Sequence, residues 1–218
     1  MTEKISNDYE KLKNFTENAS HELQTPLAII KGKTELLMQT QGLTEEQSKL
    51  ISEIDQTSNR LKKLNQTLLL LSKIENNQFK NEKSIDFSEI LKSKLEQIED
   101  LIKIKNIKLN AQIESSSQNI NPVLADILIS NLLSNALRYT PENGAISIQL
   151  NSKEFLISNN GNPLKFGGDK IFDRFHKEGE SSESTGLGLA LVKQIAVINK
   201  QGINYQYSNN MHFFTYIF

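Results

Sequence analysis

The 218-residue sequence lacks cysteine, has almost no net charge and contains no long hydrophobic run. Without cysteine no disulfide forms, which fits a reducing compartment, and the chain is long enough to bury a core without one. A formal net charge of −1 provides no basic field for nucleic acid or an anionic membrane. No apolar stretch approaches the roughly 18 residues of a membrane helix, and no signal-peptide pattern opens the sequence. We therefore expect a cytoplasmic segment of one or two domains that contacts neither nucleic acid nor membrane.

The N-terminal part of the chain is organised around His21, within a predicted helix from about residue 3 to 41 that Pro26 should bend. At helical spacing His21 lies roughly 170° from the middle of the apolar stripe. An exposed imidazole beside Glu22 has a chemical use, since the carboxylate can take the proton of one ring nitrogen while the other attacks an electrophile. Taken alone, the pair is more typical of an ordinary solvated helix surface. The apolar stripe comprises Leu12, Ala19, Leu23, Leu27, Ile30, Thr34 and Leu37.

A second helix is predicted over residues 45–77, after a turn at Gly42 and a capping residue at Thr44. Its apolar positions alternate four and three apart, which is a heptad pattern. Two such helices joined by a tight turn form an antiparallel hairpin, and we expect two hairpins to pair into a dimeric four-helix bundle. The alternative is that the hairpin packs on the rest of its own chain. The heptad positions are Leu50, Ile54, Thr57, Leu61, Leu64, Leu68 and Leu71.

The pattern changes after a polar, aperiodic linker at residues 78–84, which separates the hairpin, residues 1–77, from a second domain, residues 85–218. Helices and hairpin-connected strands in one unit predict an α/β sandwich with helices on one face of a mixed sheet. The fold class is therefore multidomain, α followed by α+β. Helices are expected at 88–104, from Pro122 to about 139, and from Gly188 to about 200; strands are expected at 84–87, 107–113, 146–150, 155–157, 203–207 and 212–218.

Three segments of the second domain share chemistry suited to a nucleotide. On a helix, Asn131, Asn135 and Arg138 project from one side at i, i+4 and i+7. Two carboxamides and a guanidinium can supply an oxygen ligand for Mg²⁺ and donors for phosphate. The same residues are also unremarkable on a solvated helix face.

The other two segments are turns. Asn159 can offer its side-chain oxygen to an exocyclic amine, and Gly161 lets the backbone approach a flat base. Gly186 and Gly188 precede an apolar helix, where backbone N–H groups can face phosphate oxygens. The pattern is neither a Walker loop nor a complete Rossmann fingerprint. Each turn alone has an ordinary structural explanation, as a surface turn or a helix cap.

Residues 15–27, with Ala-Ser-His-Glu-Leu at their centre, resemble the phosphoacceptor box of two-component sensor histidine kinases, except that Gln24 replaces a basic residue. The second domain resembles the catalytic ATP-binding domain of that family, whose fold is shared with type II topoisomerase, Hsp90 and mismatch-repair ATPases. The resemblance covers nearly the whole chain from about residue 10. Residues Asn131–Pro141 resemble the N box, Asn159–Leu164 the first glycine box, Phe172–Lys177 the F box and Thr185–Leu189 the second glycine box.

The resemblance implies an ATP-dependent autokinase that acts as a homodimer, with ATP and Mg²⁺ bound by the second domain. His21 would accept the γ-phosphoryl group with Glu22 as base, and would pass it to an Asp of a response regulator receiver domain. Glu22 and Thr25 also resemble the family's phosphatase signature. Family members often carry a sensor and a membrane anchor upstream. The resemblance implies that Asn135 ligates Mg²⁺ with Asn131 nearby, and that the lid, about residues 178–184, folds over the nucleotide on the second glycine box. The other implied nucleotide contacts are Arg138 and Lys177 on phosphates, Tyr139, Asn159 and Gly161 at the adenine, and Thr185, Gly186, Leu187 and Gly188 in the second glycine box.

Two departures from the family pattern favour an alternative function. The first glycine box carries Asn159 in place of an aspartate and Pro163 in place of a glycine. An amide oxygen accepts the same hydrogen bond without a charge, so nucleotide binding is expected to be weaker or less selective. The alternative is a phosphotransfer or dimerisation scaffold with a degenerate nucleotide site. A second rival, a protein-serine kinase or ATPase of the same fold, leaves His21 without a role.

Overall fold

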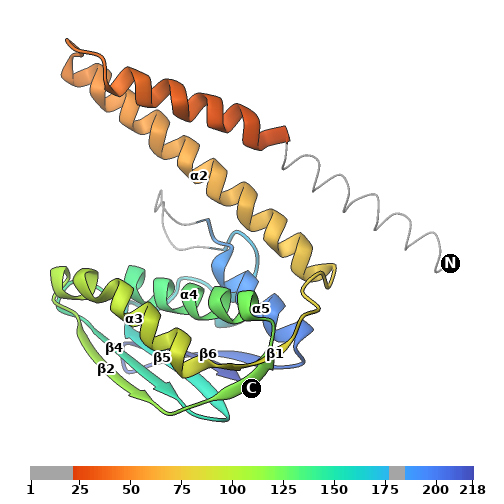
Figure 1. Ribbon diagram of the computed structural model, residues 1–218. Coiled ribbons are helices and arrows are strands. Elements are labelled where there is room, and N and C mark those ends of the chain that lie inside the picture. The colour runs from red at the N-terminus through yellow and green to blue at the C-terminus, as the bar shows by residue number, and fades with distance from the viewer. Residues whose placement is uncertain (1–21, 177–184) are drawn as a thin grey trace. The chain divides into compact units, whose positions relative to one another are not determined.

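The computed structural model describes residues 22–176 and 185–218 of the chain. They divide into two compact units, with the boundary between Lys73 and Ile74. The first unit holds a helical hairpin, and the second holds a sheet covered by helices (Figure 1). Within the described residues, no helix is both long and apolar enough to span a membrane.

The hairpin consists of a helix over residues 22–38 and helix α2 (Glu45–Glu75). Gly42 has a φ of +82°, a conformation that glycine adopts without steric cost, and it lies in the connection. Thr44 and Gln47 form a reciprocal capping box, since Gln47 N donates to Thr44 Oγ1 at 3.2 Å and Thr44 N donates to Gln47 Oε1 at 3.0 Å. The predicted turn and the predicted cap of the second helix are therefore confirmed.

The buried face of α2 differs from the predicted heptad face. Leu50, Ile54 and Leu61 are 53%, 49% and 47% exposed, whereas Ile51 and Ser58 are buried. The prediction was wrong for these three positions, where the single chain buries the neighbouring stripe, whereas the heptad position Leu71 is buried as predicted, at 2% exposed. The apolar stripe that contains Leu50, Ile54 and Leu61 is left uncovered by this chain.

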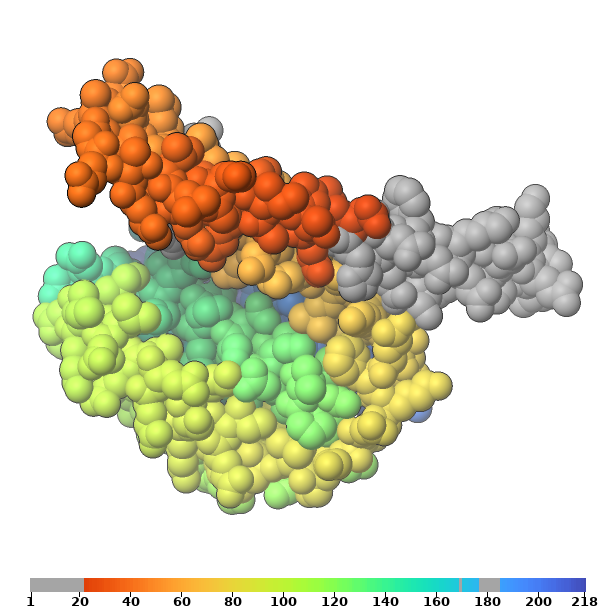
Figure 2. Space-filling view, turned by 45° about the horizontal axis from the view of Figure 1, so that its top comes forward, coloured from red at the N-terminus to blue at the C-terminus, as the bar shows by residue number. Residues whose placement is uncertain are grey.

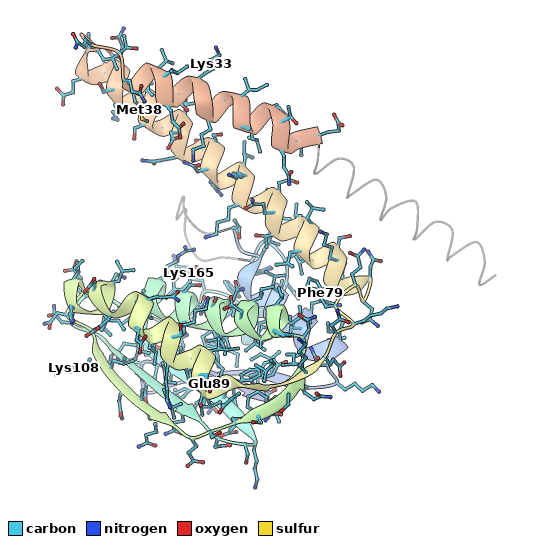
Figure 3. All side chains as sticks on the ribbon, viewed as in Figure 1. Lys33, Met38, Phe79, Glu89, Lys108 and Lys165 are labelled. Carbon is cyan, nitrogen blue, oxygen red and sulfur yellow. The ribbon has the colours of Figure 1, made fainter. Side chains whose placement is uncertain are left out.

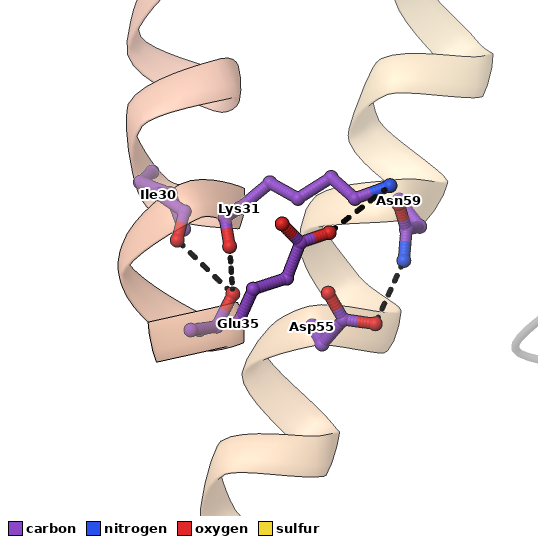
Figure 4. A network of polar contacts seen from close by, with 6 residues as sticks. Ile30, Lys31, Glu35, Asp55 and Asn59 are labelled. Carbon is purple, nitrogen blue, oxygen red and sulfur yellow. Dashed lines mark hydrogen bonds and ion pairs between the residues drawn. The ribbon is translucent and has the colours of Figure 1, made fainter. Parts of the chain in front are cut away.

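Polar contacts near the middle of the hairpin stay within each helix (Figure 4). Thr34 Oγ1 donates to the carbonyls of Ile30 and Lys31 at 3.0 and 2.8 Å, which satisfies a buried hydroxyl. Lys31 and Glu35 form an exposed i, i+4 ion pair of 3.7 Å, and Asn59 donates to Asp55. Exposed pairs of this kind contribute about 0.3–0.5 kcal/mol each. Side-chain burial is therefore the main term that holds the two helices together.

The second unit is built on a five-stranded mixed sheet in the order β2-β4-β5-β7-β6. The β2–β4 pair is parallel, and the other pairs are antiparallel. A separate two-stranded sheet pairs β1 with β3. The strands are β1 (Lys83–Asp86), β2 (Lys108–Ile113), β3 (Ser117–Ile120), β4 (Ala145–Leu150), β5 (Glu154–Asn160), β6 (Gly202–Ser208) and β7 (Met211–Ile217).

Three helices lie on one face of the five-stranded sheet, namely α3 (Phe87–Ile104), α4 (Pro122–Tyr139) and α5 (Gly188–Ile198) (Figure 1). Alternate residues of β4, β5 and β7 are buried against them, including Ile148, Ile157 and Phe214, which lie side by side in the sheet register. α3, yellow-green in the space-filling view, lies on the outside of this unit (Figure 2). The predicted α/β sandwich is confirmed.

Polar side chains set where the helices begin. Asn121 Oδ1 accepts from Val123 N at 2.9 Å, and Pro122 occupies the first helical position of α4. Asp86 caps α3 by accepting from Ser88 N, and it also accepts from the Ser115 hydroxyl and from Ser116 N. The hydrogen bond from Ser115, followed by that from Ser88, lowers the pKa of Asp86 from 3.8 to about 2.

Two elements were not predicted. β3 pairs with β1 although Ser117, Gln118 and Asn119 lack the apolar alternation of a strand. A short 3₁₀ helix, η1 (Gly168–Phe172), ends at the first residue of the segment that resembles the F box. The edge strand β2, which begins at the labelled Lys108, was expected one residue earlier (Figure 3).

Candidate functional site

The structure describes the predicted phosphoacceptor segment from Glu22 onward. Glu22 and Thr25 are both exposed on the helix over residues 22–38, three residues apart, whereas Leu27 is buried. His21 and Lys177 lie outside the described residues, so their predicted roles stay predictions. The exposed carboxylate and hydroxyl are accessible to another protein, which their predicted role requires.

The polar face of α4 carries Asn131, Asn135 and Arg138, all partly exposed. Asn131 Nδ2 donates to the Ile127 carbonyl at 2.7 Å, one turn earlier, so the orientation of this amide is set. Within residues 22–176 and 185–218, the side chains of Asn135 and Arg138 form no hydrogen bond or ion pair. Their amide oxygen and guanidinium are therefore available to a ligand.

The first turn of α5 lies directly against this face. A Cβ at Gly188 would lie 2.7 Å from Asn131 Oδ1, closer than real Cβ contacts. A side chain at position 188 would therefore displace the Asn131 amide at the point where the two segments meet. Leu187, which precedes it, is fully buried and anchors the turn in the core. Thr185 is the first described residue after the gap.

Gly186 joins the segment that resembles the F box to the same region. Its φ of +69° favours glycine, and a Cβ there would lie 2.9 Å from the Phe175 backbone. Phe175 N donates to the Gly186 carbonyl at 2.9 Å. Three segments that are separate in the sequence, namely the α4 face, the glycine turn and the residues around Phe175, are thus brought together.

The C-terminal end of α4 is held by a cation that the sequence did not single out. Lys105 Nζ donates to the Leu137 and Thr140 carbonyls at 2.9 and 3.4 Å. A positive charge at a helix C-terminus is stabilising, and it satisfies carbonyls left without a partner inside the helix. Arg138 and Tyr139 lie in this last turn, and Tyr139 is partly exposed.

Asn159 is the most enclosed of the polar side chains predicted for the site, at 1% exposed. Its Nδ2 donates to the Asn160 carbonyl at 2.9 Å, while its Oδ1 accepts no hydrogen bond within the described residues. A nearly buried acceptor suits a ligand that donates from an amine.

Gly161 has a neighbour that sequence reasoning missed. A Cβ at Gly161 would lie 2.5 Å from His212 Nε2, so the imidazole occupies the space where a side chain would project. His212 is buried and is the register partner of Asn159. No local signal marks it, because the contact depends on the pairing of β5 with β7. A base could therefore approach Gly161 only from the side that the His212 ring does not occupy.

The donor set fits a nucleotide with its metal ion. The described residues contain no group of three or more His, Cys, Asp or Glu side chains that could hold a metal. A Mg²⁺ ion here would therefore depend on the Asn135 amide oxygen, with Asn131 nearby, and on phosphate oxygens of the ligand, which are the hard ligands it prefers. The Asn159 acceptor would meet the amine of an adenine.

Two family models match the chain. Residues 11–77 match the His Kinase A (phospho-acceptor) domain, and residues 121–211 match the histidine kinase-, DNA gyrase B- and HSP90-like ATPase. The heme sensor protein HssS of Staphylococcus aureus (strain Newman) is 33% identical over 215 residues, which cover 96% of this chain and 47% of the relative. The chain thus spans about half the length of the curated relatives it matches.

Solved structures show the same fold. The Acinetobacter baumannii histidine kinase AdeS matches with a TM-score of 0.60 at 24% identity, over 90% of this chain and 96% of that one. Full-length ShkA in complex with AMPPNP matches with a TM-score of 0.67 at 18% identity, over 93% of this chain and 45% of that one. The family models, the relative and the fold agree, and the chain belongs to the sensor histidine kinases of two-component systems.

Proposed function

We propose that this chain is the kinase core of a sensor histidine kinase, which phosphorylates itself on His21 with ATP and passes the phosphoryl group to an Asp of a response regulator. In this proposal residues 1–77 carry the phosphoacceptor and the dimer interface, 78–84 form a linker and 85–218 bind ATP. The observation that carries it is the contact between Asn131 and Gly188, which brings the amide face of α4 and the glycine turn to one place. ShkA, a structural relative, is known in complex with AMPPNP.

The chemical step follows from the residues. One imidazole nitrogen of His21 attacks the γ-phosphorus, the bond from that phosphorus to the β–γ bridging oxygen breaks, and ADP leaves. Glu22, adjacent in the sequence and exposed, takes the proton from the imidazole. Mg²⁺, when bound, would neutralise part of the negative charge on the phosphates. Arg138 and Lys177 add cations at the phosphates, so catalysis depends mainly on positioning and charge.

Phosphatase activity toward the response regulator is a further part of the proposal. Glu22 and Thr25 lie one turn apart and are both exposed, so the Thr25 hydroxyl can orient a water molecule against a phospho-Asp that docks there. Thr25→Ala is expected to slow dephosphorylation of a phosphorylated receiver domain while autophosphorylation of His21 continues. Equal loss of both activities would contradict a separate role for Thr25.

A homodimer through the hairpin is supported by the uncovered stripe of α2. Leu50, Ile54 and Leu61 recur on one side and are about half exposed in the single chain. Apolar side chains at heptad spacing are stabilised when a second hairpin covers them. Ile54→Lys is expected to shift the chain to a monomer in sedimentation experiments, whereas Lys62→Gln, a change at an exposed position, leaves the dimer intact.

Calorimetry of ATP binding distinguishes this proposal from its rival, a scaffold with a degenerate nucleotide site. The proposal predicts saturable ATP binding that requires Mg²⁺ and falls at least tenfold in Asn135→Ala, since the amide supplies a metal ligand. Lys193→Ala is the control, because it removes an exposed side chain of α5 that pairs only loosely with Asp173, at 4.0 Å. Absence of Mg²⁺-dependent binding in the unaltered chain favours the scaffold.

A further inference from the structure

The loop over residues 161–168, which follows β5 and contains the labelled Lys165 (Figure 3), rests on the β6–β7 hairpin at both of its ends. At one end, a Cβ on Gly161 would lie 2.5 Å from the His212 ring. At the other end, a Cβ on Gly168 would lie 2.8 Å from the Tyr205 ring. Glycine therefore stands at each point where the loop meets a ring, and a larger residue would displace that ring.

The two rings act as one support. Tyr205 Oη and His212 Nδ1 are 2.8 Å apart and share a hydrogen bond, and the ring centroids lie 5.9 Å apart at an interplanar angle of 27°. Tyr205 also packs on Phe214, with ring centroids 5.2 Å apart. His212 is only 7% exposed. Both rings lie on the helix-facing side of the sheet, because Phe214 is buried there and alternate residues share a face.

Two hydrogen bonds to the backbone of Gly161 hold this end of the loop on the same hairpin. Tyr207 Oη donates to the Gly161 carbonyl at 3.1 Å, and Gly161 N donates to the Asn210 carbonyl at 3.2 Å. The start of the loop is thus bound on both of its backbone groups. The hairpin therefore sets where the loop begins. The loop itself contains the stiff Pro163.

The position of the loop matters for Asn159. Its amide donates from Nδ2 to the carbonyl of Asn160, the residue before Gly161. If the amide turned over, two oxygen atoms would face each other, so the bond keeps Oδ1 directed away from the loop as the group offered to a ligand. The Asn160 side chain is anchored separately, because its Oδ1 accepts from Ala145 N, whereas its carbonyl lies in the peptide unit that it shares with Gly161. A shift of the loop would therefore move the carbonyl that orients Asn159.

We propose that Tyr205 and His212 are positioning residues for base recognition: by supporting the loop over residues 161–168 they keep the uncharged Asn159 amide oriented as an acceptor, and so preserve a preference for 6-aminopurine nucleotides. The inference rests on the proposed binding of ATP to this domain. In this proposal the β6–β7 hairpin orders the loop. The ordered loop in turn compensates for the carboxylate that is missing at Asn159. A nucleotide whose purine carries a 6-oxo group, such as ITP, presents an oxygen to the Asn159 oxygen and is disfavoured.

The test compares three ligands, ATP, ITP and inorganic tripolyphosphate, each with Mg²⁺, by calorimetry on the full chain. Tyr205→Phe removes only the hydroxyl that bonds to His212. We expect it to weaken ATP binding about five- to tenfold, the effect of one lost hydrogen bond, and to reduce the ATP-to-ITP preference by the same factor. Tripolyphosphate affinity should stay unchanged because the phosphate contacts do not depend on the loop.

The matched control is Tyr216→Phe. It removes another tyrosine hydroxyl of the same sheet, which donates to Gln201 Oε1 at 2.7 Å and does not touch the loop. The proposal is overturned if Tyr205→Phe keeps the ATP-to-ITP preference, or if Tyr216→Phe reduces it equally. Gly168→Ala, which inserts a Cβ against the Tyr205 ring, gives the same readout should Tyr205→Phe fail to fold. Failure of the unaltered chain to bind ATP would instead overturn the proposed function.

Discussion

Gly188→Ala tests nucleotide binding separately from the stability of the fold. The new Cβ would lie 2.7 Å from Asn131 Oδ1, and the amide must retreat by about 0.7 Å to reach ordinary contact. Asn131 cannot turn freely, because its Nδ2 donates to the Ile127 carbonyl at 2.7 Å. The substitution therefore displaces the amide at the centre of the candidate site, or breaks its hydrogen bond.

The cost to stability is expected to be close to zero. Alanine is favoured over glycine in a helix by up to about 1 kcal/mol, and Gly188 is the first residue of α5. The lost or strained hydrogen bond of Asn131 offsets this by about 0.5–1.5 kcal/mol. Urea denaturation should thus give a free energy of unfolding within about 1 kcal/mol of the unaltered chain.

ATP affinity should fall at least tenfold in the same variant, as measured by calorimetry with Mg²⁺. Gly32→Ala is the matched control, since Gly32 lies in the helix over residues 22–38 with nothing within 4 Å of an added Cβ. It should leave ATP affinity unchanged and raise stability slightly. Unaltered ATP affinity in Gly188→Ala would refute the role of the contact between Asn131 and the glycine turn.

Two further predictions concern what holds the second unit together. Asp86→Ala removes the cap of α3 and should lower the free energy of unfolding by about 1 kcal/mol at pH 7. The pKa of Asp86 is lowered from 3.8 to about 2 in the folded state. The stabilisation by the Asp86 carboxylate is therefore present above pH 4 and is lost as the pH falls toward 2. Urea denaturation of the variant and the unaltered chain at pH 7 and pH 3 should therefore show a smaller difference at pH 3, and a difference that grows on acidification would contradict the assignment. Lys105→Met removes both hydrogen bonds to the end of α4 and should cost about 1 kcal/mol; the same measurement checks it, and a variant as stable as the unaltered chain would show that the lysine contributes nothing.

Most elements follow from local signals in the sequence. α4 begins at Pro122 and ends at Tyr139, as predicted, because its N-cap and its apolar run are both local features. β4 and β7 were found because apolar residues alternate along them. The α4 face and the glycine turn were identified separately from their residue types, and the structure places them in contact.

What could not be predicted depends on partners distant in the sequence. β3 is a strand because β1 pairs with it, not because of its own polar residues. The buried face of α2 was assigned to the leucine stripe, since a heptad pattern does not say which stripe a partner from the same chain covers. His212 and Tyr205 reach the loop after β5 only through the register of three strands.

The central claim, phosphoryl transfer to His21, is tested most directly by incubating the chain with Mg²⁺ and ATP labelled in the γ-phosphate. The account predicts a protein-bound label that is labile in acid, stable in base, absent from His21→Gln and retained in the unaltered chain. A label that is stable in acid, or one that His21→Gln still acquires, would contradict it.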